Sequence, residues 1–153
     1  MEPFDDWYRV EHPRLLASML LISGSLDEAR EATDEALARA YERWARVGAM
    51  ESPGGWTYRV AVNLLRRRGR RRSLEQRLLA RRPLDAATIP APAGEAWSLV
   101  AALPLRQRTA VVLRYAADLP EADIARIMGI RRSTVAATLT QARHRLALEV
   151  ADG

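Results

Sequence analysis

The sequence predicts an all-α protein built from two small helical domains joined by a flexible linker. Apolar residues recur at helical spacing over most of the chain, and no useful stretch alternates apolar and polar residues as a half-buried strand would. Glycine, proline and serine stand where these periodic segments stop and start. The proline-containing stretch 83–94 divides the chain, so we expect domains over 1–82 and 95–153.

The first two helices are predicted over 4–22 and 25–47. Pro13 is expected to bend the first, because proline has no N–H to donate to the preceding turn. Ser25 and Glu28 form a capping-box pattern at the start of the second helix. One face of this helix is small and apolar, and acidic residues cover the rest. The apolar face is formed by Ala29, Ala32, Ala36, Leu37, Ala40, Tyr41 and Trp44.

A third helix is predicted to follow the loop 48–51. Ser52 is a good N-cap, and Pro53 suits the first helical position, where its missing N–H costs nothing. The helix becomes strongly basic, with seven arginines and no acidic residue over 59–72. Such a run repels itself unless an anion binds it, so we interpret it as a surface for a polyanion.

The C-terminal part is predicted to hold helices over 96–102 and 105–117, followed by a helix-turn-helix over 119–146. Apolar residues at helical spacing mark the two helices of this motif, and Gly129 supplies the turn. Its apolar residues are Ile124, Ala125, Met128, Val135, Leu139 and Leu146. The second helix of such a motif enters the DNA major groove. An ordinary helical hairpin with a solvated arginine face is the alternative interpretation.

Composition excludes several classes of function. The 153 residues contain no cysteine, which excludes disulfides, cysteine-bound zinc and thiol catalysis. The stretch 15–22 is the longest apolar one and is far too short to span a bilayer. The N-terminus lacks the basic start and apolar run of a signal peptide. We therefore expect a cytoplasmic protein.

Charge is segregated along the chain. Residues 1–51 hold six arginines against eleven acidic residues, whereas residues 52–82 hold ten arginines against one. The remaining residues, 83–153, are nearly balanced, with eight arginines against seven acidic residues. An acidic block beside a basic one indicates two different partners, one positively charged and one polyanionic.

This order of parts resembles a bacterial sigma factor of the extracytoplasmic-function (ECF) group, in the sigma-70 family. The resemblance is carried by DEAREATDEALARAYERW, SPGGWTYRVAVNLLRRRGRRR and LPLRQRTAVVLRYAADLPEADIARIMGI. It implies that 1–82 is sigma region 2, which binds core polymerase and opens the −10 element. It also implies that 95–153 is region 4, which reads the −35 element. Core RNA polymerase, promoter DNA and an anti-sigma protein are the partners that the resemblance implies.

The acidic helix is, by this resemblance, the polymerase-binding surface. Exposed acids along one helix also suit a basic partner and steer its approach. The matching positions are Glu31, Asp34, Glu35 and Arg39. The family's usual AEDLVQE reads AREATDE here, so Arg30 replaces an acid and Asp34 a glutamine. A solvated face without a partner is the alternative.

The basic helix is expected to face the −10 element, and the loop 48–51 to capture a base flipped from the opened strand. An indole can stack on bases, arginines neutralise phosphates, and an asparagine can hydrogen-bond a base edge. The expected residues are Trp56, Arg59, Asn63, Arg66 and Arg67. Trp56 could instead belong to the core, and Asn63 could be a buried, hydrogen-bonded amide.

The second helix of the helix-turn-helix is expected to read the −35 element. Its candidate residues are Arg131, Arg132, Ser133, Thr134, Ala137, Thr138, Gln141 and Arg143. The family commonly reads GTVKSRLSRAR where this chain reads STVAATLTQAR, so Ala136, Thr138 and Gln141 stand in place of one lysine and two arginines. We therefore expect a changed preferred hexamer. Gln141 can pair with adenine if it faces the groove.

Other functions explain less of the chain. A stand-alone helix-turn-helix regulator that does not bind polymerase leaves the acidic and arginine-rich helices without a role. An enzyme is disfavoured because His12 and His144 are the only histidines, and no glycine loop for phosphate, metal-ligand cluster or nucleophile elbow occurs. We expect no catalytic residue, no cofactor and no metal. Membrane binding through 66–72 lacks an adjacent apolar anchor face.

Overall fold

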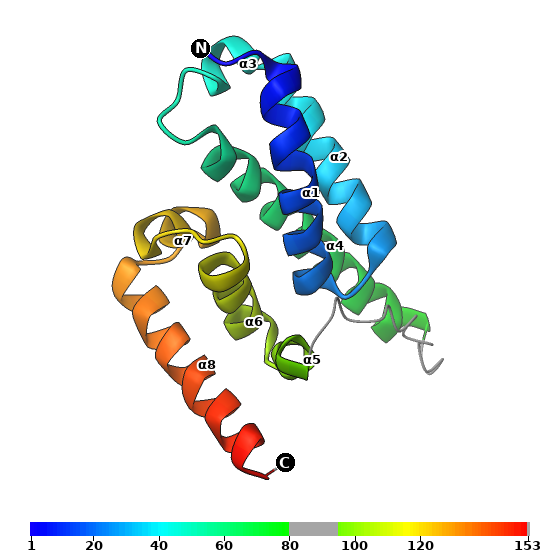
Figure 1. Ribbon diagram of the computed structural model, residues 1–153. Coiled ribbons are helices and arrows are strands. Elements are labelled where there is room, and N and C mark those ends of the chain that lie inside the picture. Colours follow the sequence, from blue (N-terminus) through cyan, green and yellow to red (C-terminus); the bar gives the residue numbers. More distant parts are fainter. Residues whose placement is uncertain (80–94, 153) are drawn as a thin grey trace.

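The computed structural model describes residues 1–79 and 95–152, and all regular elements in these residues are helices (Figure 1). The predicted all-α fold class is therefore confirmed. The linker expected over 83–94 lies outside the described residues, and the division into domains stays a prediction. We refer to residues 1–79 as the N-terminal half and to residues 95–152 as the C-terminal half.

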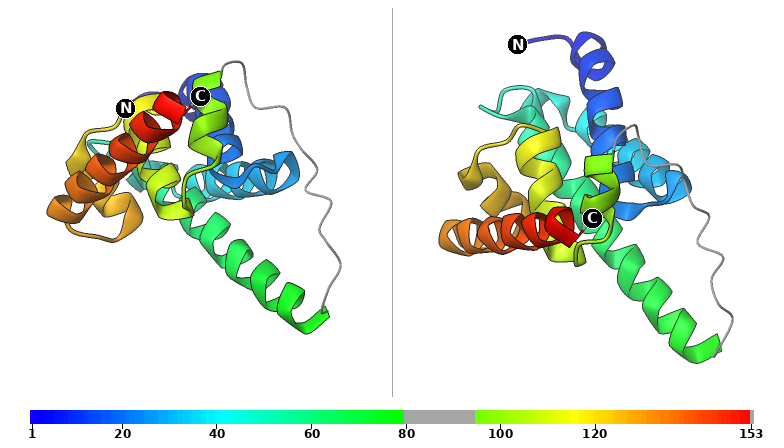
Figure 2. Two further views of the ribbon diagram at one scale, coloured as in Figure 1. Left: turned by 90° about the horizontal axis from the view of Figure 1, so that it is seen from below. Right: turned by 60° about the horizontal axis from the view of Figure 1, so that its bottom comes forward.

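Three long helices and one short one form the N-terminal half. They are α1 (Phe4–Ser23), α2 (Leu26–Glu42), α3 (Trp44–Val47) and α4 (Pro53–Leu79). α1 packs along α2, and α2 packs against α4 (Figure 1). α1 remains helical through Pro13. The C-terminal end of α4 projects from the body of the molecule (Figure 2).

The helix predicted over 25–47 is divided in two. α2 ends at Glu42, Arg43 leaves the helical conformation with φ −112° and ψ 23°, and α3 begins at Trp44. The side chain of Trp44 packs against the buried Trp7, with ring centroids 4.9 Å apart. Tyr41 was predicted to lie on the apolar face, which is wrong: its side chain is 65 % exposed. α1 begins at Phe4, beside Tyr41, and does not extend further along α2. Tyr41 therefore lies at the edge of the contact between α1 and α2.

The predicted N-caps are present. Ser25 Oγ accepts a hydrogen bond from the amide of Glu28 at 3.3 Å, and Ser52 Oγ accepts one from the amide of Gly55 at 3.0 Å. These bonds satisfy amides at the helix start that have no intrahelical acceptor. The Glu28 carboxylate forms an ion pair with Arg72 of α4. The cap of α2 thus also helps to position α4.

Five helical segments form the C-terminal half. They are α5 (Glu95–Ala101), α6 (Leu105–Val111), the π-helix η1 (Val112–Ala116), α7 (Glu121–Met128) and α8 (Arg132–Asp152). The helix predicted over 105–117 thus changes from α to π geometry near its end. Within the described residues, no helix has both the length and the apolar character needed to cross a membrane.

The predicted helix-turn-helix is formed by α7 and α8, which pack on each other. Gly129 joins them in the left-handed conformation, with φ 66° and ψ 35°, which a side chain would strain. Ile124 and Met128 from α7 are fully buried, as are Val135 and Leu139 from α8. The apolar stripes predicted for these two helices therefore form their contact.

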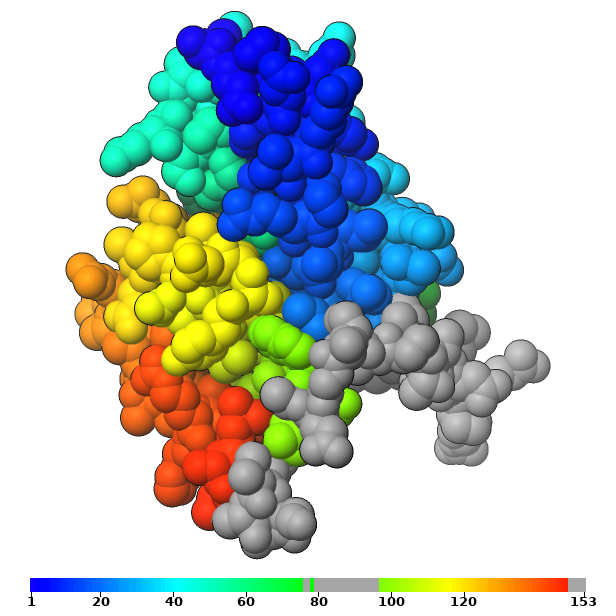
Figure 3. Space-filling view, in the orientation of Figure 1, coloured from blue at the N-terminus to red at the C-terminus, as the bar shows by residue number. Residues whose placement is uncertain are grey.

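The two halves pack on one another over a broad surface. α7 lies against α4, and η1 lies against α1 (Figures 1 and 3). The guanidinium Nη2 of Arg14 donates a hydrogen bond to the carbonyl of Ala117 at 3.4 Å, which connects α1 to the end of η1. The chain termini lie at opposite ends of the molecule (Figure 1).

Candidate nucleic-acid and protein interfaces

The acidic residues of α2 divide between two sides of the helix. Glu31 forms an ion pair with Arg68 of α4, so this acid faces the basic helix. Asp34 lies on the side of α1, where its carboxylate is 3.9 Å from Nε2 of His12. Glu35 is exposed and accepts a hydrogen bond from Arg39 Nε at 3.0 Å. Of the residues predicted to bind polymerase, Asp34, Glu35 and Arg39 lie away from α4.

The arginine-rich stretch of α4 also has two sides. Arg68 and Arg72 turn towards α2 and pair with Glu31 and Glu28. The expectation that this run needs an external anion is therefore wrong for Arg68 and Arg72, which pair with acids of α2, and it stays a prediction for the other arginines. The sequence could not show this, since the acids lie about 40 residues away in the chain.

A stripe of polar residues follows the opposite side of α4. Arg59, Asn63 and Arg67 are all exposed and stand four residues apart, so they lie above one another on one face. The exposure of Asn63 excludes the alternative of a buried amide. These three side chains form what we call the α4 stripe. Two cations flanking an amide can neutralise phosphates while the amide contacts a base edge.

Trp56 lies at the beginning of the α4 stripe. Its ring is partly buried against the core and also lines a cleft of about 500 Å³. Both interpretations of Trp56 thus have a structural counterpart: one side packs inward and another borders open space. Arg59 and the loop residues 50–52 line the same cleft, and Asp123 and Ile127 of α7 form its far wall. The C-terminal half therefore stands directly over the start of the predicted −10 surface.

The predicted base-capturing loop is held at its base by tight packing. A Cβ atom added to Gly48 would lie 2.7 Å from Cε2 of Trp44 and 2.8 Å from Sδ of Met1, so only glycine fits. The indole Nε1 of Trp44 donates a hydrogen bond to the carbonyl of Glu2 at 3.1 Å. The first residues of the chain therefore help to place this loop, a contribution that the sequence did not indicate.

A buried carboxyl group lies beneath the start of α4. Glu11 of α1 is 8 % exposed, and its carboxyl atoms would be 3.4–3.5 Å from a Cβ added to Gly54. Burial raises the pKa of Glu11, and the nearby positive charge of Arg14 lowers it by less. Sequence reasoning missed this residue. Trp7, Glu11 and Leu15 stand four apart, and a charged residue within that buried stripe was the available signal.

The start of α8 presents the predicted −35 residues unevenly. Arg131, Arg132 and Ser133 are exposed at the beginning of the helix, and Ala137 and Gln141 are exposed one and two turns later. Thr134 is partly buried. These side chains, apart from Thr134, form one accessible surface at the N-terminal end of the helix, where base contacts concentrate in such motifs.

Two predicted −35 residues are engaged within the protein. Thr138 is 5 % exposed, and its hydroxyl donates a hydrogen bond to the carbonyl of Thr134 at 2.7 Å, so it is not available to a base edge. Arg143 Nε donates to the hydroxyl of Tyr115 at 2.8 Å, and its guanidinium lies over that ring. Burial against the neighbouring helix removes Thr138 from the accessible surface, and η1 holds Arg143.

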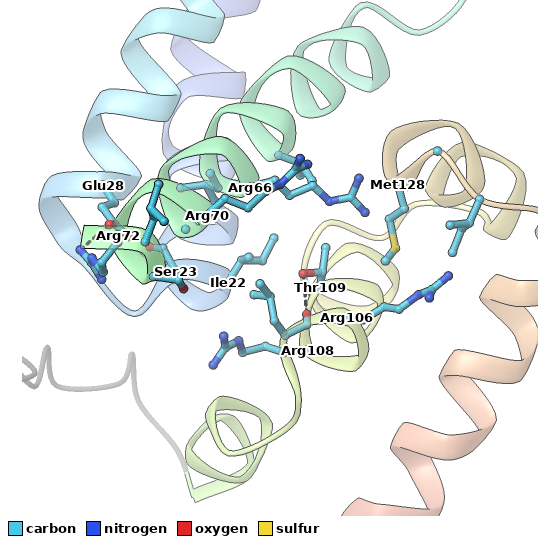
Figure 4. A pocket seen from close by; sticks show the side chains of 18 residues that line it. Ile22, Ser23, Glu28, Arg66, Arg70, Arg72, Arg106, Arg108, Thr109 and Met128 are labelled. Atoms are coloured by element: carbon cyan, nitrogen blue, oxygen red, sulfur yellow. Dashed lines mark hydrogen bonds and ion pairs between the residues drawn. The ribbon is translucent and has the colours of Figure 1, made fainter. Parts of the chain in front are cut away.

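A larger cleft of about 1080 Å³ is lined by residues of α4, of α6 and of the end of α7 (Figure 4). Its lining combines arginines from both halves with apolar side chains such as Ile22 and Met128. The arginines are Arg66, Arg70, Arg72, Arg106 and Arg108. Burial lowers the pKa of Arg108. Arg66 was grouped with Arg59 and Arg67, but it lines this cleft, whereas Arg59 borders the smaller cleft beside Trp56.

Comparison with known proteins agrees with this arrangement. The family model described as Sigma-70, region 4 matches residues 93–146. The chain is 28 % identical over 151 residues to the RNA polymerase sigma-E factor of Streptomyces coelicolor, a match covering 96 % of this chain and 85 % of that protein.

A solved structure has the same fold. It is the sigma factor RpoE of Bartonella quintana in complex with the anti-sigma factor NepR, with a TM-score of 0.73 and 22 % identity over 94 % of this chain and 93 % of that one. The curated relative matches both halves, and the family model matches the helix-turn-helix. Residues 93–146 thus match sigma-70 region 4, and the similarity over nearly the whole chain to a curated sigma factor supports a sigma factor of the extracytoplasmic-function type.

Proposed function

We propose that the N-terminal half of this sigma factor binds core RNA polymerase and opens the −10 element, while the C-terminal half reads the −35 element. The observation that carries the proposal is the α4 stripe, in which Arg59, Asn63 and Arg67 share one exposed face. This stripe begins beside Trp56 and the loop that precedes α4. An aromatic ring, a tight loop and a basic face placed together suit an opened DNA strand.

The polymerase contact is assigned to the sides of α2 that do not face α4. Asp34, Glu35 and Arg39 lie there, whereas Glu31 is paired with Arg68. Exposed carboxylates increase the rate of encounter with a basic surface and orient the approach. Glu31 can therefore join this contact only when polymerase displaces Arg68 from its carboxylate.

Promoter binding requires the two halves to move apart. The −10 and −35 elements are about 25 base pairs apart by their numbering, which is roughly 85 Å of B-form DNA. Here α7 lies directly against α4, so both elements cannot be reached at once. The 12 residues from 83 to 94 extend to about 40 Å at most, which, with the size of the halves, permits separation. Polymerase then holds two weak DNA readers near one promoter.

An anti-sigma protein is the remaining proposed partner. The Bartonella relative of known structure is bound to an anti-sigma factor, and this chain has the same fold over nearly its whole length. The cytoplasm, where polymerase and promoter DNA are found, is the proposed location. The family resemblance does not favour the alternative of a stand-alone regulator.

The proposal is tested by run-off transcription with purified core polymerase on pooled GC-rich promoter fragments. We expect discrete transcripts only when this protein is added. Replacing both Asn63 and Arg67 with alanine should reduce transcript yield at least tenfold, whereas Arg9→Ala, an exposed arginine on α1, should not. Binding to duplex DNA without polymerase, with no transcripts, would identify a stand-alone regulator instead.

A further inference from the structure

The larger cleft carries more positive charge than its acidic lining neutralises. Five arginines and one acidic residue, Glu28, line it, and Glu28 pairs with Arg72. Among the described side chains, no ion pair engages the other four arginines. They are Arg66, Arg70, Arg106 and Arg108. A cleft lined by charges of one sign concentrates ligands of the opposite sign.

These four arginines come from both halves of the chain. Arg66 and Arg70 stand four apart on α4, so they share the face that borders the cleft. Arg106 and Arg108 belong to α6. Figure 4 shows that Arg106 extends to the side of Met128, whereas Arg108 extends to the opposite side. An anion bound between α4 and Arg106 would therefore contact both halves.

Arg108 is oriented by the protein but keeps its charge. It is partly buried, and its Nη1 donates a hydrogen bond to the carbonyl of Ala101 at 2.9 Å. A carbonyl oxygen is uncharged, so this bond does not neutralise the guanidinium. Arg108 therefore adds to the positive potential of the cleft without being needed as a direct contact.

Apolar side chains line the cleft beside the arginines. Ile22, Leu65 and Met128 belong to the buried core. Two further leucines are exposed: Leu74 of α4 by 57 % and Leu105 of α6 by 50 %. They line the same cleft from different halves. A planar ring bound between α4 and α6 would cover apolar surface that water now contacts.

Size and chemistry together indicate the class of ligand. The volume of about 1080 Å³ is close to the upper end of the range for small-molecule sites, roughly 300–1000 Å³. A matching ligand has several negative charges at one end and a planar ring at the other. Guanidinium groups bind phosphate oxygens in pairs and also stack on aromatic rings. A nucleoside triphosphate combines these features.

We propose that this cleft binds a nucleoside triphosphate, with the phosphates at Arg66, Arg70 and Arg106 and the base against Leu74 and Leu105. Because both halves supply contacts, the nucleotide binds only while they are packed together, and it holds them in that arrangement. At a concentration of about 100 times its Kd, such a ligand favours the packed arrangement roughly 100-fold. The site goes beyond the proposed function, and only its effect on promoter binding rests on that function.

The test is calorimetric titration of the full-length protein with ATP and with GTP, in the absence of polymerase and DNA. We expect saturable binding of one nucleotide per chain. Inorganic triphosphate has the charge without the ring, and we expect it to bind about tenfold more weakly. Guanosine, which has no phosphate, should give no measurable binding. Equal affinity for inorganic triphosphate and the nucleotides would overturn the assignment of a nucleoside.

Variants at exposed positions test each part of the site. Arg106→Glu should lower nucleotide affinity by about tenfold or more, because it removes a charged hydrogen-bond donor and adds a repelling charge. Arg106→Lys keeps the charge and should retain most of the affinity. Leu105→Ser should weaken nucleotide binding by about threefold or more and leave that of inorganic triphosphate unchanged. Thermal unfolding should show that these variants remain folded.

Arg9→Glu is the matched control. It makes the same change of charge at an exposed position on α1, away from the cleft lining, and should bind nucleotide as the original protein does. An equal loss of affinity in Arg9→Glu would show that binding follows net charge, and unchanged affinity in Arg106→Glu would place the nucleotide elsewhere. Either result would overturn the site.

The effect on promoter binding is measured separately, as the rate at which the protein forms a complex with core polymerase and promoter DNA. Nucleotides also bind polymerase, so the original protein and Arg106→Glu are compared under the same conditions. We expect saturating nucleotide to slow the original protein by about tenfold or more and not to slow Arg106→Glu. Equal effects on both would overturn the holding role. Failure of the original protein to form the complex without nucleotide would instead overturn the proposed function.

Discussion

Glu11 illustrates how a single residue links the core to the predicted −10 surface. Its carboxyl group is buried between α1 and the first turn of α4, close to Gly54. Gly54 precedes Trp56 by two residues on that helix. Nearby, the hydroxyl groups of Ser18 and Tyr58 share a hydrogen bond of 3.2 Å. The first turn of α4, from which the α4 stripe continues, therefore packs on a buried carboxyl group.

The raised pKa of Glu11 makes stability depend on pH. The folded state disfavours the charged carboxylate. The contribution of the protonated Glu11 to the free energy of unfolding is therefore complete below the ordinary glutamate pKa of 4.5, and it is lost as pH rises through the folded-state pKa. We expect Glu11→Gln to raise Tm at pH 7 by roughly 2–4 °C, the shift that about 1 kcal/mol produces in a chain of this length. At pH 4 the two proteins should unfold at similar temperatures. An equal difference at both pH values would contradict this account.

The helix-turn-helix shows what a single glycine contributes to an element. Gly129 has φ 66°, and a Cβ added there would meet no atom within 4 Å. Gly69, inside α4, likewise has open space around it but has no such φ. The two glycines thus differ in backbone conformation, whereas an added Cβ atom would be uncrowded at both.

This pair gives a matched prediction for stability. We expect Gly129→Ala to lower the free energy of unfolding by about 1–2 kcal/mol, the cost of a side chain in the left-handed region. Gly69→Ala should have the opposite sign, with a gain of up to about 1 kcal/mol from helix propensity. Urea denaturation measures both. A stabilising Gly129→Ala would show that the turn adopts another conformation.

Within α8, the structure separates two residues that the sequence grouped together. Gln141 is exposed, whereas Thr138 is buried and hydrogen-bonded to the carbonyl of Thr134. We expect Gln141→Ala to reduce discrimination at one −35 base pair by about 1–3 kcal/mol. Thr138→Val should leave the preferred sequence unchanged. Selection of promoter sequences in vitro with both variants measures this difference, and a changed preference in Thr138→Val would contradict it.

At the scale of the whole molecule, the packing of the halves determines which surfaces are accessible. α7 faces the beginning of the α4 stripe across the smaller cleft, and Arg14 is hydrogen-bonded to the carbonyl of Ala117 across the contact of the two halves. The exposed start of α8 lies on the C-terminal half. The polymerase-free arrangement therefore leaves the predicted −35 surface more accessible than the predicted −10 surface.

Separation of the halves can be measured by fluorescence energy transfer. The chain has no cysteine, so Ala17→Cys in α1 and Ala147→Cys in α8, both at exposed positions, allow specific labelling. We expect high transfer in the free protein and a marked fall when core polymerase and promoter DNA are both present. The control is duplex DNA added without polymerase. Unchanged transfer in the full complex would show that promoter binding does not require separation.

The sequence by itself determined the features that depend on neighbouring residues. The N-caps at Ser25 and Ser52, the turn at Gly129 and the apolar stripes of α7 and α8 follow from short-range backbone chemistry and helical spacing, and the structure has them all. The family resemblance also depended on local motifs. The all-α class follows from the same periodicity.

Only the tertiary structure decided which side chains remain accessible. The pairing of Arg68 with Glu31, the burial of Thr138 and the exposure of Tyr41 each depend on which helix lies opposite. The contact of α7 with α4 is of the same kind. Helical spacing places a residue on a face, but it does not tell what packs against that face, because contacts between distant segments form only when the whole chain folds.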